Sequence, residues 1–168
     1  YAHLSSAFHV SPYDEACVLS VDGFGDFAST AWGYGLNTDI KIDNKIFFPH
    51  SLGIFYQALT QFLGFKNYGD EYKIMGLAPY GKPKYVEKLR EMISIKNKGN
   101  FELNLNYFKF HKQDFNYRWE NGKVEIDDLY SNKIVDLLGP ERKKEEALTD
   151  FHKDIAHSTQ KIYEEVFL

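Results

Sequence analysis

The sequence predicts an α/β domain in which an antiparallel β-meander is followed by packed helices. Three short strand-like segments follow one another closely near the N-terminus, apolar residues then recur at helical spacing, and a later segment returns to strict alternation. This order of elements is typical of α/β and α+β domains. Hydrophobic residues make up 43% of the 168 residues, which is enough for a packed core.

The predicted strands cover Ala16–Asp22, Asp26–Leu36 and Ile40–Phe48. The first is an apolar run that ends at an Asp-Gly turn, the second is small, aromatic and glycine-bearing, and the third alternates before it becomes apolar. Short polar linkers, Gly23–Gly25 and Asn37–Asp39, join them. Strands joined by such short linkers form an antiparallel meander.

The first predicted helix, Ser51–Leu63, is expected to pack on this meander. Ser51 is a suitable N-cap, and Gly64 is a natural C-terminal stop. Its apolar face consists of Leu52, Phe55, Leu59, Phe62 and Leu63.

Further elements follow from the same periodicities. A short helix or turn is expected at Tyr72–Ala78, before Pro79, and Pro83 opens a helix that runs to about Ile95. Phe101–Tyr107 alternates as a half-buried strand does, and Asp114–Tyr130 suggests loops with a short strand. The last helix is expected over Glu145–Leu168, with an apolar stripe of Leu148, Phe151, Ile155, Ile162 and Val166.

Composition limits the partners and the compartment. A formal net charge of −4 argues against a nucleic-acid surface, and no run of about 18 apolar residues suggests a membrane span. Cys17 is the only cysteine, so no internal disulfide forms, and a cytoplasmic protein fits. The sequence opens at Tyr1 without Met and ends at Leu168 inside a predicted helix, so we expect a fragment of a longer protein.

The strongest local feature for chemistry is the segment Val21–Asp26. A predicted strand delivers the Asp22 carboxylate into a turn where Gly23 and Gly25 let backbone N–H groups approach an anion. The carboxylate can hold a metal, and the turn can cradle phosphate or carbamoyl oxygens. A β-turn in which Asp22 bonds its own backbone is the ordinary alternative.

Two other features are weaker. If the segment around His3 is helical, a His four residues earlier, before Tyr1, would complete a two-His metal site; otherwise His3 is an ordinary surface or packed residue. The segment Tyr68–Gly81 combines carboxylates that can bind ribose hydroxyls with a glycine, Gly81, that lets adenosine approach the backbone. An exposed charged turn is the alternative there.

Together these segments resemble the carbamoyltransferases of nodulation-factor and antibiotic biosynthesis, over nearly the whole chain. The markers are HLSSAF at His3–Phe8, Ser11–Tyr13, Val21–Gly23 with Gly25, Ser51–Gly53 with Phe55 and Tyr56, Leu63–Phe65, EYKIMGLAPYG at Glu71–Gly81, Leu138–Pro140, and Asp154–Ala156 with Gln160.

The resemblance implies a partial actin-like ATPase (ribonuclease H-like) domain, as in the enzymes that form threonylcarbamoyladenosine in tRNA. It implies an O-carbamoyltransferase whose downstream domain, absent from this sequence, makes carbamoyl adenylate from carbamoyl phosphate and ATP. The domain represented here then transfers the carbamoyl group to a hydroxyl of a small-molecule or sugar acceptor. A homodimer of the full-length protein is left open.

The resemblance also assigns site residues. His3 and Asp22 match ligands of a divalent metal, with iron expected first and manganese or zinc as alternatives, and Asp22 is the catalytic candidate. Gly23 and Gly25 would lie against the carbamoyl adenylate, as would, on weaker grounds, Glu71, Lys73 and Gly81. Ser51 and Tyr56 would line the acceptor pocket.

Two other classes of function stay open. One is a sugar-kinase-type phosphotransferase of the same superfamily, which needs an Asp-Gly phosphate loop but neither His3 nor the Glu71–Gly81 segment. The other is a non-catalytic binding domain.

Overall fold

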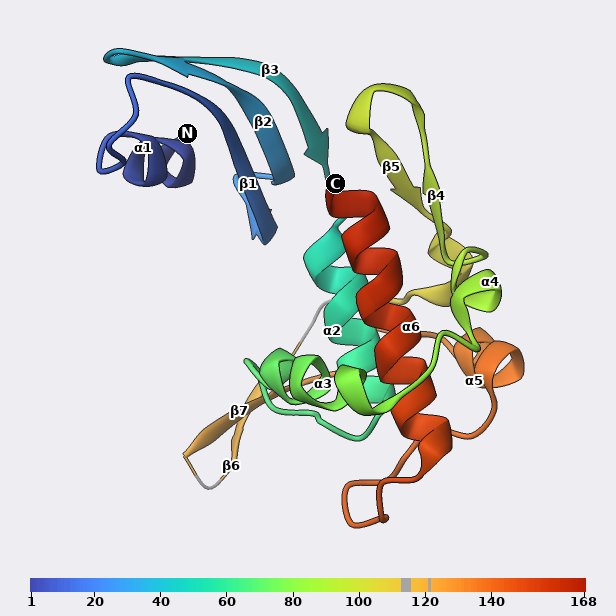
Figure 1. The fold of residues 1–168 in the computed structure, drawn as a ribbon. Coiled ribbons are helices and arrows are strands. Elements are labelled where there is room, and N and C mark those ends of the chain that lie inside the picture. The colour runs from blue at the N-terminus through green and yellow to red at the C-terminus, as the bar shows by residue number, and fades with distance from the viewer. Residues whose placement is uncertain (113–115, 121) are drawn as a thin grey trace. The chain divides into compact units, whose positions relative to one another are not determined.

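The computed structural model describes residues 1–112, 116–120 and 122–168 (Figure 1). The chain forms two compact units, Tyr1–Gly53 and Ile54–Leu168. No helix in the described part of the chain is both long and apolar enough to cross a membrane. The α/β class with antiparallel sheets is confirmed.

The N-terminal unit contains the predicted meander. Its strands are β1 (Glu15–Gly25), β2 (Ala28–Leu36) and β3 (Asp39–Phe47), paired antiparallel in the order β1-β2-β3. Within this unit, the helix that packs on the sheet is α1 (Ala2–Phe8), beside β1 (Figure 1). The expected packing of Ser51–Leu63 on the meander stays a prediction, because most of that helix belongs to the other unit.

The predicted loop at Gly23–Gly25 is wrong. β1 continues to Gly25, which pairs with Ala28, so the turn is formed by Asp26 and Phe27. Their φ angles are 47° and 66°, as a two-residue type I′ hairpin requires. The second strand therefore begins two residues later than predicted. The glycines at positions 23 and 25 suggested a loop, but they lie where the pairing of β1 with β2 is irregular, at a register shift between Val21 and Gly25.

A second irregularity lies in β3. Gly33 pairs with Ile42, but Trp32 pairs with Asn44, so Asp43 is an extra residue on that strand. Such a bulge moves every following side chain to the other face of the sheet.

The C-terminal unit is mainly helical and is built around α6 (Asp150–Phe167). α6 contacts α3 (Glu71–Leu77), its continuation η1 (Ala78–Tyr80) and α4 (Val86–Leu89). The remaining helices are α2 (Leu52–Phe62), which begins in the N-terminal unit, η2 (Asn97–Gly99), η3 (Leu105–Tyr107) and α5 (Lys133–Leu138).

The prediction for α2 is confirmed almost to the residue. Gly64 has a φ of 80°; its N–H donates to the Gln61 carbonyl, and that of Phe65 donates to the Thr60 carbonyl. This is the Schellman arrangement, which ends a helix at a glycine. The apolar face is fully buried or nearly so: Leu52 is 1% exposed, and Phe55, Leu59, Phe62 and Leu63 are 0% exposed.

The helix predicted from Pro83 to Ile95 is wrong over most of its length. Only α4 is helical, and Ile93–Ile95 forms β4, which pairs with β5 (Phe101–Leu103). The predicted strand Phe101–Tyr107 is accordingly too long. Asn104 ends it, because its side chain accepts from the Asn106 N–H and so caps η3.

In the last third of the chain, the structure differs from the prediction in three elements. β6 (Tyr117–Glu120) and β7 (Lys123–Ile126) form a hairpin in the segment expected to be loops with a short strand; residues 114, 115 and 121 of that segment lie outside the described residues. α5 was not predicted. α6 begins at Asp150 rather than Glu145, since the Thr149 N–H donates to Nδ1 of His152, and Leu148 is therefore exposed outside the helix.

Candidate functional site

The main candidate site lies in the N-terminal unit, where α1 meets the end of β1. Nδ1 of His3 lies 3.2 Å from Oδ2 of Asp22, and these side chains are 70% and 40% exposed. The two residues are nineteen positions apart in the sequence and belong to different elements. The structure therefore brings together the imidazole and the carboxylate that the sequence singled out.

Apolar packing of α1 sets the position of His3. Leu4, the next residue, is 1% exposed, and Phe8 is 4% exposed; both pack against Val18 and Ala31 of the sheet. Because Leu4 and Phe8 lie four residues apart on one helical face, they fix the rotation of α1. His3 is carried to the edge of that apolar cluster, next to Asp22.

The backbone at Asp22 is held from two sides. Oδ1 of Asp22 accepts from the Gly23 N–H at 2.7 Å, and the Ser51 hydroxyl donates to the Asp22 carbonyl at 3.0 Å. A Cβ on Gly53 would lie 2.9 Å from the same carbonyl oxygen. Ser51 is 0% exposed, so its visible role is to position Asp22. Acceptor binding by Ser51 stays a prediction.

A cavity of about 390 Å³ lies beside the His3–Asp22 pair. It is polar along much of its wall and has the size of a small-molecule site. Its lining consists of Tyr1, Ala2, His3, Leu4, Ser20, Asp22, Asp26, Ala28, Ser29, Thr30, Ala31, Lys45 and Phe47.

Gly23 has no structural reason within its own unit to be a glycine. A Cβ there would meet nothing within 4 Å, and its φ is not positive. A glycine inside a strand often marks a place where another molecule or backbone approaches closely. Gly25, the last residue of β1, pairs with Ala28 across the hairpin turn.

The adenylate candidates lie in the C-terminal unit, with their own local partners. Nζ of Lys73 lies 2.7 Å from Oδ1 of Asp70, which is 6% exposed. A Cβ on Gly81 would lie 2.0 Å from the Lys153 carbonyl oxygen, so this glycine lets α6 approach. Glu71 begins α3 and is partly exposed. Nucleotide contacts of these residues stay predictions.

Tyr56 is also engaged within the C-terminal unit. Its hydroxyl donates to Oε1 of Gln160 at 2.8 Å, and its ring packs edge-on against Tyr163. Burial raises the pKa of Tyr56, so it stays a neutral hydrogen-bond donor at ordinary pH. Only 3% of it is exposed, and its predicted place in an acceptor pocket is untested.

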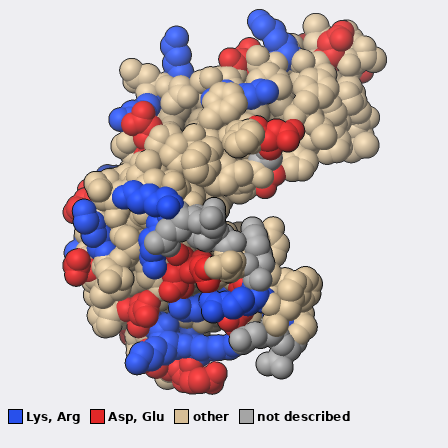
Figure 2. Space-filling model, turned by 180° about the vertical axis from the view of Figure 1, so that it is seen from behind, with Lys and Arg blue, Asp and Glu red and all other residues tan. Residues whose placement is uncertain are grey.

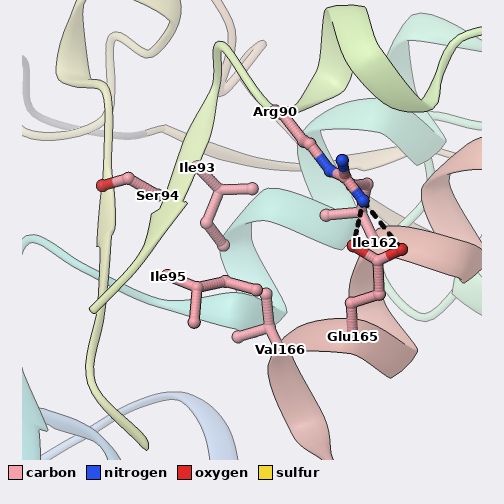
Figure 3. A pocket seen from close by; sticks show the side chains of 7 residues that line it. All are labelled: Arg90, Ile93, Ser94, Ile95, Ile162, Glu165 and Val166. Atoms are coloured by element: carbon pink, nitrogen blue, oxygen red, sulfur yellow. Dashed lines mark hydrogen bonds and ion pairs between the residues drawn. The ribbon is translucent and has the colours of Figure 1, made fainter. Parts of the chain in front are cut away.

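A second cavity, of about 240 Å³, lies between α6 and β4 (Figure 3). Ile93, Ile95, Ile162 and Val166 make it mostly apolar, and the Arg90 guanidinium closes one side by pairing with both oxygens of Glu165 at 3.1 and 2.9 Å. None of the predicted site residues lines it.

Charges of both signs are interspersed on one face of the molecule. On the face that Figure 2 shows, Lys and Arg lie among Asp and Glu. Several of the bases are paired, for example Lys66 with Asp128 at 2.9 Å and Lys84 with Asp154 at 2.7 Å.

Sequence reasoning assigned no site role to two residues around the pair, Gly53 and Lys45. Gly53 was recognisable as a glycine in the first turn of a helix, where it weakens the helix and needs a reason. Lys45 gave no usable signal, because simple alternation places it on the wrong face of the sheet. The bulge at Asp43 brings it to the cavity wall.

Within the described ranges, the His3–Asp22 pair is not part of a larger cluster of metal-ligating side chains. No group of three or more His, Cys, Asp or Glu side chains gathers among the residues that the structure describes. His3 and Asp22 can supply two ligands, and any others must come from elsewhere.

The N-terminal unit is thus a three-stranded meander packed against a helix, with an imidazole–carboxylate pair at the wall of a small cavity. The family follows from comparison with known proteins. The family model described as carbamoyltransferase N-terminus matches residues 1–168. The chain belongs to this family.

Three curated proteins are similar to this chain. An uncharacterized protein of Synechocystis, sll1178, is 41% identical over 99% of the chain and 25% of its own length. Nodulation protein NolNO of Sinorhizobium fredii is 31% identical over 98% of the chain and 21% of its length. Nodulation protein NolO of Bradyrhizobium diazoefficiens is 38% identical over 61% of the chain and 19% of its own length. The chain thus spans about a quarter or less of the length of these relatives.

Proposed function

We propose that the full-length protein is an O-carbamoyltransferase that moves a carbamoyl group from carbamoyl adenylate to a hydroxyl of a small-molecule or sugar acceptor. The observation that carries this proposal is the family match over residues 1–168 together with the His3–Asp22 pair at a cavity wall. The nodulation proteins among the relatives add support for a carbamoyltransferase.

The donor set of the pair fits a divalent metal. An imidazole nitrogen and a carboxylate oxygen suit iron, manganese or zinc, whereas magnesium prefers oxygen ligands throughout. Two ligands about 2.1 Å from one ion lie about 3 Å apart, close to the 3.2 Å between His3 and Asp22. A metal held there would supply Lewis-acid polarisation of a carbonyl or phosphoryl oxygen.

The proposed reaction balances as an acyl transfer. The acceptor oxygen forms a bond to the carbamoyl carbon, and the bond between that carbon and the adenylate oxygen breaks. AMP leaves, and the hydroxyl proton is released. Backbone N–H groups of the Gly23–Gly25 segment would stabilise the negative charge that develops on the carbamoyl oxygen. The Gly23 N–H, which donates to Oδ1 of Asp22, would have to exchange that bond for one to the substrate.

This proposal includes an actin-like fold for the complete domain and a separate downstream domain that makes the adenylate from carbamoyl phosphate and ATP. It also includes adenylate contacts from Glu71, Lys73 and Gly81. The support is the resemblance of the Glu71–Gly81 segment and of the glycine-bearing strand end to the family.

The test uses the full-length protein with ATP, carbamoyl phosphate and a panel of sugar and small-molecule acceptors. We expect formation of phosphate, pyrophosphate and AMP, and mass spectrometry should show one acceptor about 43 Da heavier, because a carbamoyl group replaces the hydroxyl hydrogen. Transfer of a phosphoryl group instead would support a kinase, and nucleotide binding without turnover would support a binding domain. Either result overturns the proposal.

A further inference from the structure

Lys45 contributes a cation to the wall of the cavity beside His3 and Asp22. In the sheet, Ser20 pairs with Ala31 and Ala31 pairs with Lys45, so these three residues form one row across the strands. Residues opposite each other in antiparallel strands point to the same face. Ala31 packs against α1, so Lys45 lies on the face that carries His3.

The bulge at Asp43 places Lys45 there. Ile42 also packs toward the α1 cluster, three residues before Lys45. In a regular strand, residues three apart point to opposite faces. The extra residue reverses this, and bulges commonly re-aim a side chain at a functional site.

The charge of Lys45 is available to a ligand. In the part of the chain that the structure describes, its ammonium has no carboxylate within ion-pair distance, whereas Lys66, Lys73 and Lys84 each have one. Lys45 is also the only Lys or Arg among the residues that line this cavity, all of which are described. Asp22 and Asp26 supply the negative charges on the wall.

We propose that Lys45 makes this cavity an anion-binding site and holds the phosphoryl group of a nucleoside phosphate beside the His3–Asp22 pair. The nature of the ligand rests on the proposed function, in which the donor is an adenylate. An ammonium binds a phosphoryl oxygen as a compact point charge. Binding the phosphoryl group there positions the attached carbamoyl group near Asp22, so Lys45 is a positioning residue.

The first experiment is lysine footprinting of the full-length protein. Reductive methylation is followed at Lys45 by peptide mass spectrometry, with AMP, with adenosine and without either. Lys41 is the internal control, because it is exposed on the same strand but pairs with Tyr34 on the opposite face. We expect AMP to slow methylation of Lys45 several-fold, adenosine to leave it unchanged, and Lys41 to respond to neither.

Variants separate a positioning role from a structural one. Lys45→Ala should raise the KM for the donor roughly tenfold with unchanged thermal stability, Lys45→Arg should restore most of the affinity, and Lys41→Ala should behave as wild type. Absence of protection by AMP, or equal protection by adenosine, overturns the proposal. Footprinting detects binding and does not need turnover, so it tests the anion site independently of the reaction. A wild-type protein that transfers no carbamoyl group would refute the proposed function, and the footprint of Lys45 would still decide the anion site.

Discussion

The carboxylate of Asp22 is shared between a side chain and a backbone: Oδ2 lies 3.2 Å from Nδ1 of His3, while Oδ1 accepts from the Gly23 N–H at 2.7 Å. The backbone contact fixes the orientation of the carboxylate. The imidazole contact depends on α1, which Leu4 and Phe8 anchor to the sheet. The pair therefore depends on the packing of the whole N-terminal unit.

Replacing Asp22 tests the metal and the transfer step together. In full-length Asp22→Ala, we expect lower metal content and a loss of carbamoyl transfer of at least about a hundredfold, since the proposed metal would lose a ligand. Carbamoyl-phosphate-dependent ATP turnover should persist, because the proposal assigns that step to a separate downstream domain. Metal analysis and the two assays measure this, with circular dichroism as the folding control. Transfer at the wild-type rate would mean that Asp22 is only a turn residue.

Gly23→Ala separates folding from ligand approach. A methyl group at this position meets no protein atom within 4 Å, so alanine should not destabilise the protein and should raise the free energy of unfolding by up to about 1 kcal/mol. If the donor approaches this backbone, its KM should rise roughly tenfold because the methyl group occupies the same space. Denaturant unfolding and steady-state kinetics on one preparation give both values, and an unchanged KM would remove Gly23 from the site.

Gly53→Ala should be damaging for a different reason. The new Cβ would lie 2.9 Å from the Asp22 carbonyl oxygen, and a backbone atom cannot move away cheaply. We expect a loss of about 1–3 kcal/mol in unfolding free energy together with reduced transfer.

Gly76→Ala is the matched control for Gly53→Ala. Gly76 also lies in a helix, but its Cβ position is open, so alanine there should stabilise the protein by about 0.5–1 kcal/mol. Equal effects of the two substitutions on stability would show that the close approach at Asp22 is unimportant.

The lowered pKa of His152 leads us to expect that the protein loses stability in mild acid. Burial lowers the pKa of His152, and the Arg142 guanidinium lowers it further, so folded His152 stays neutral and accepts the Thr149 N–H. Unfolded His152 takes up a proton near pH 6.5. Below about that pH the unfolded state binds more protons than the folded state, so the free energy of unfolding decreases as the pH falls toward the lower pKa of folded His152. Above about that pH, the stabilising contribution of His152 is fully present.

The variant His152→Gln isolates this effect. Glutamine can accept the same N–H without titrating. Lowering the pH from 7.5 to 5.5, about one unit either side of the unfolded pKa, should therefore reduce the free energy of unfolding of the wild type more than that of the variant. His111, whose pKa is also lowered by burial, is present in both proteins and cancels. Parallel pH profiles would contradict the prediction.

Local patterns predicted much of the fold. The apolar face of Leu52–Phe62 and its glycine stop produced α2 almost to the residue, because caps and helical periodicity act over a few neighbouring positions. The segment from Pro83 to Ile95 failed for the opposite reason. Its last residues are held by pairing with Phe101–Leu103, and helical spacing in the sequence does not reveal that partner.

The sequence by itself determined the membership in the carbamoyltransferase family, the three-stranded meander, and His3 and Asp22 as the residues to examine. Only the tertiary structure decided that these two lie 3.2 Å apart and that Lys45 joins their cavity. The reason is physical: the packing of α1 on the sheet sets the first, and the bulge at Asp43 sets the second. Both depend on contacts between different elements, which the periodicity within one element does not encode.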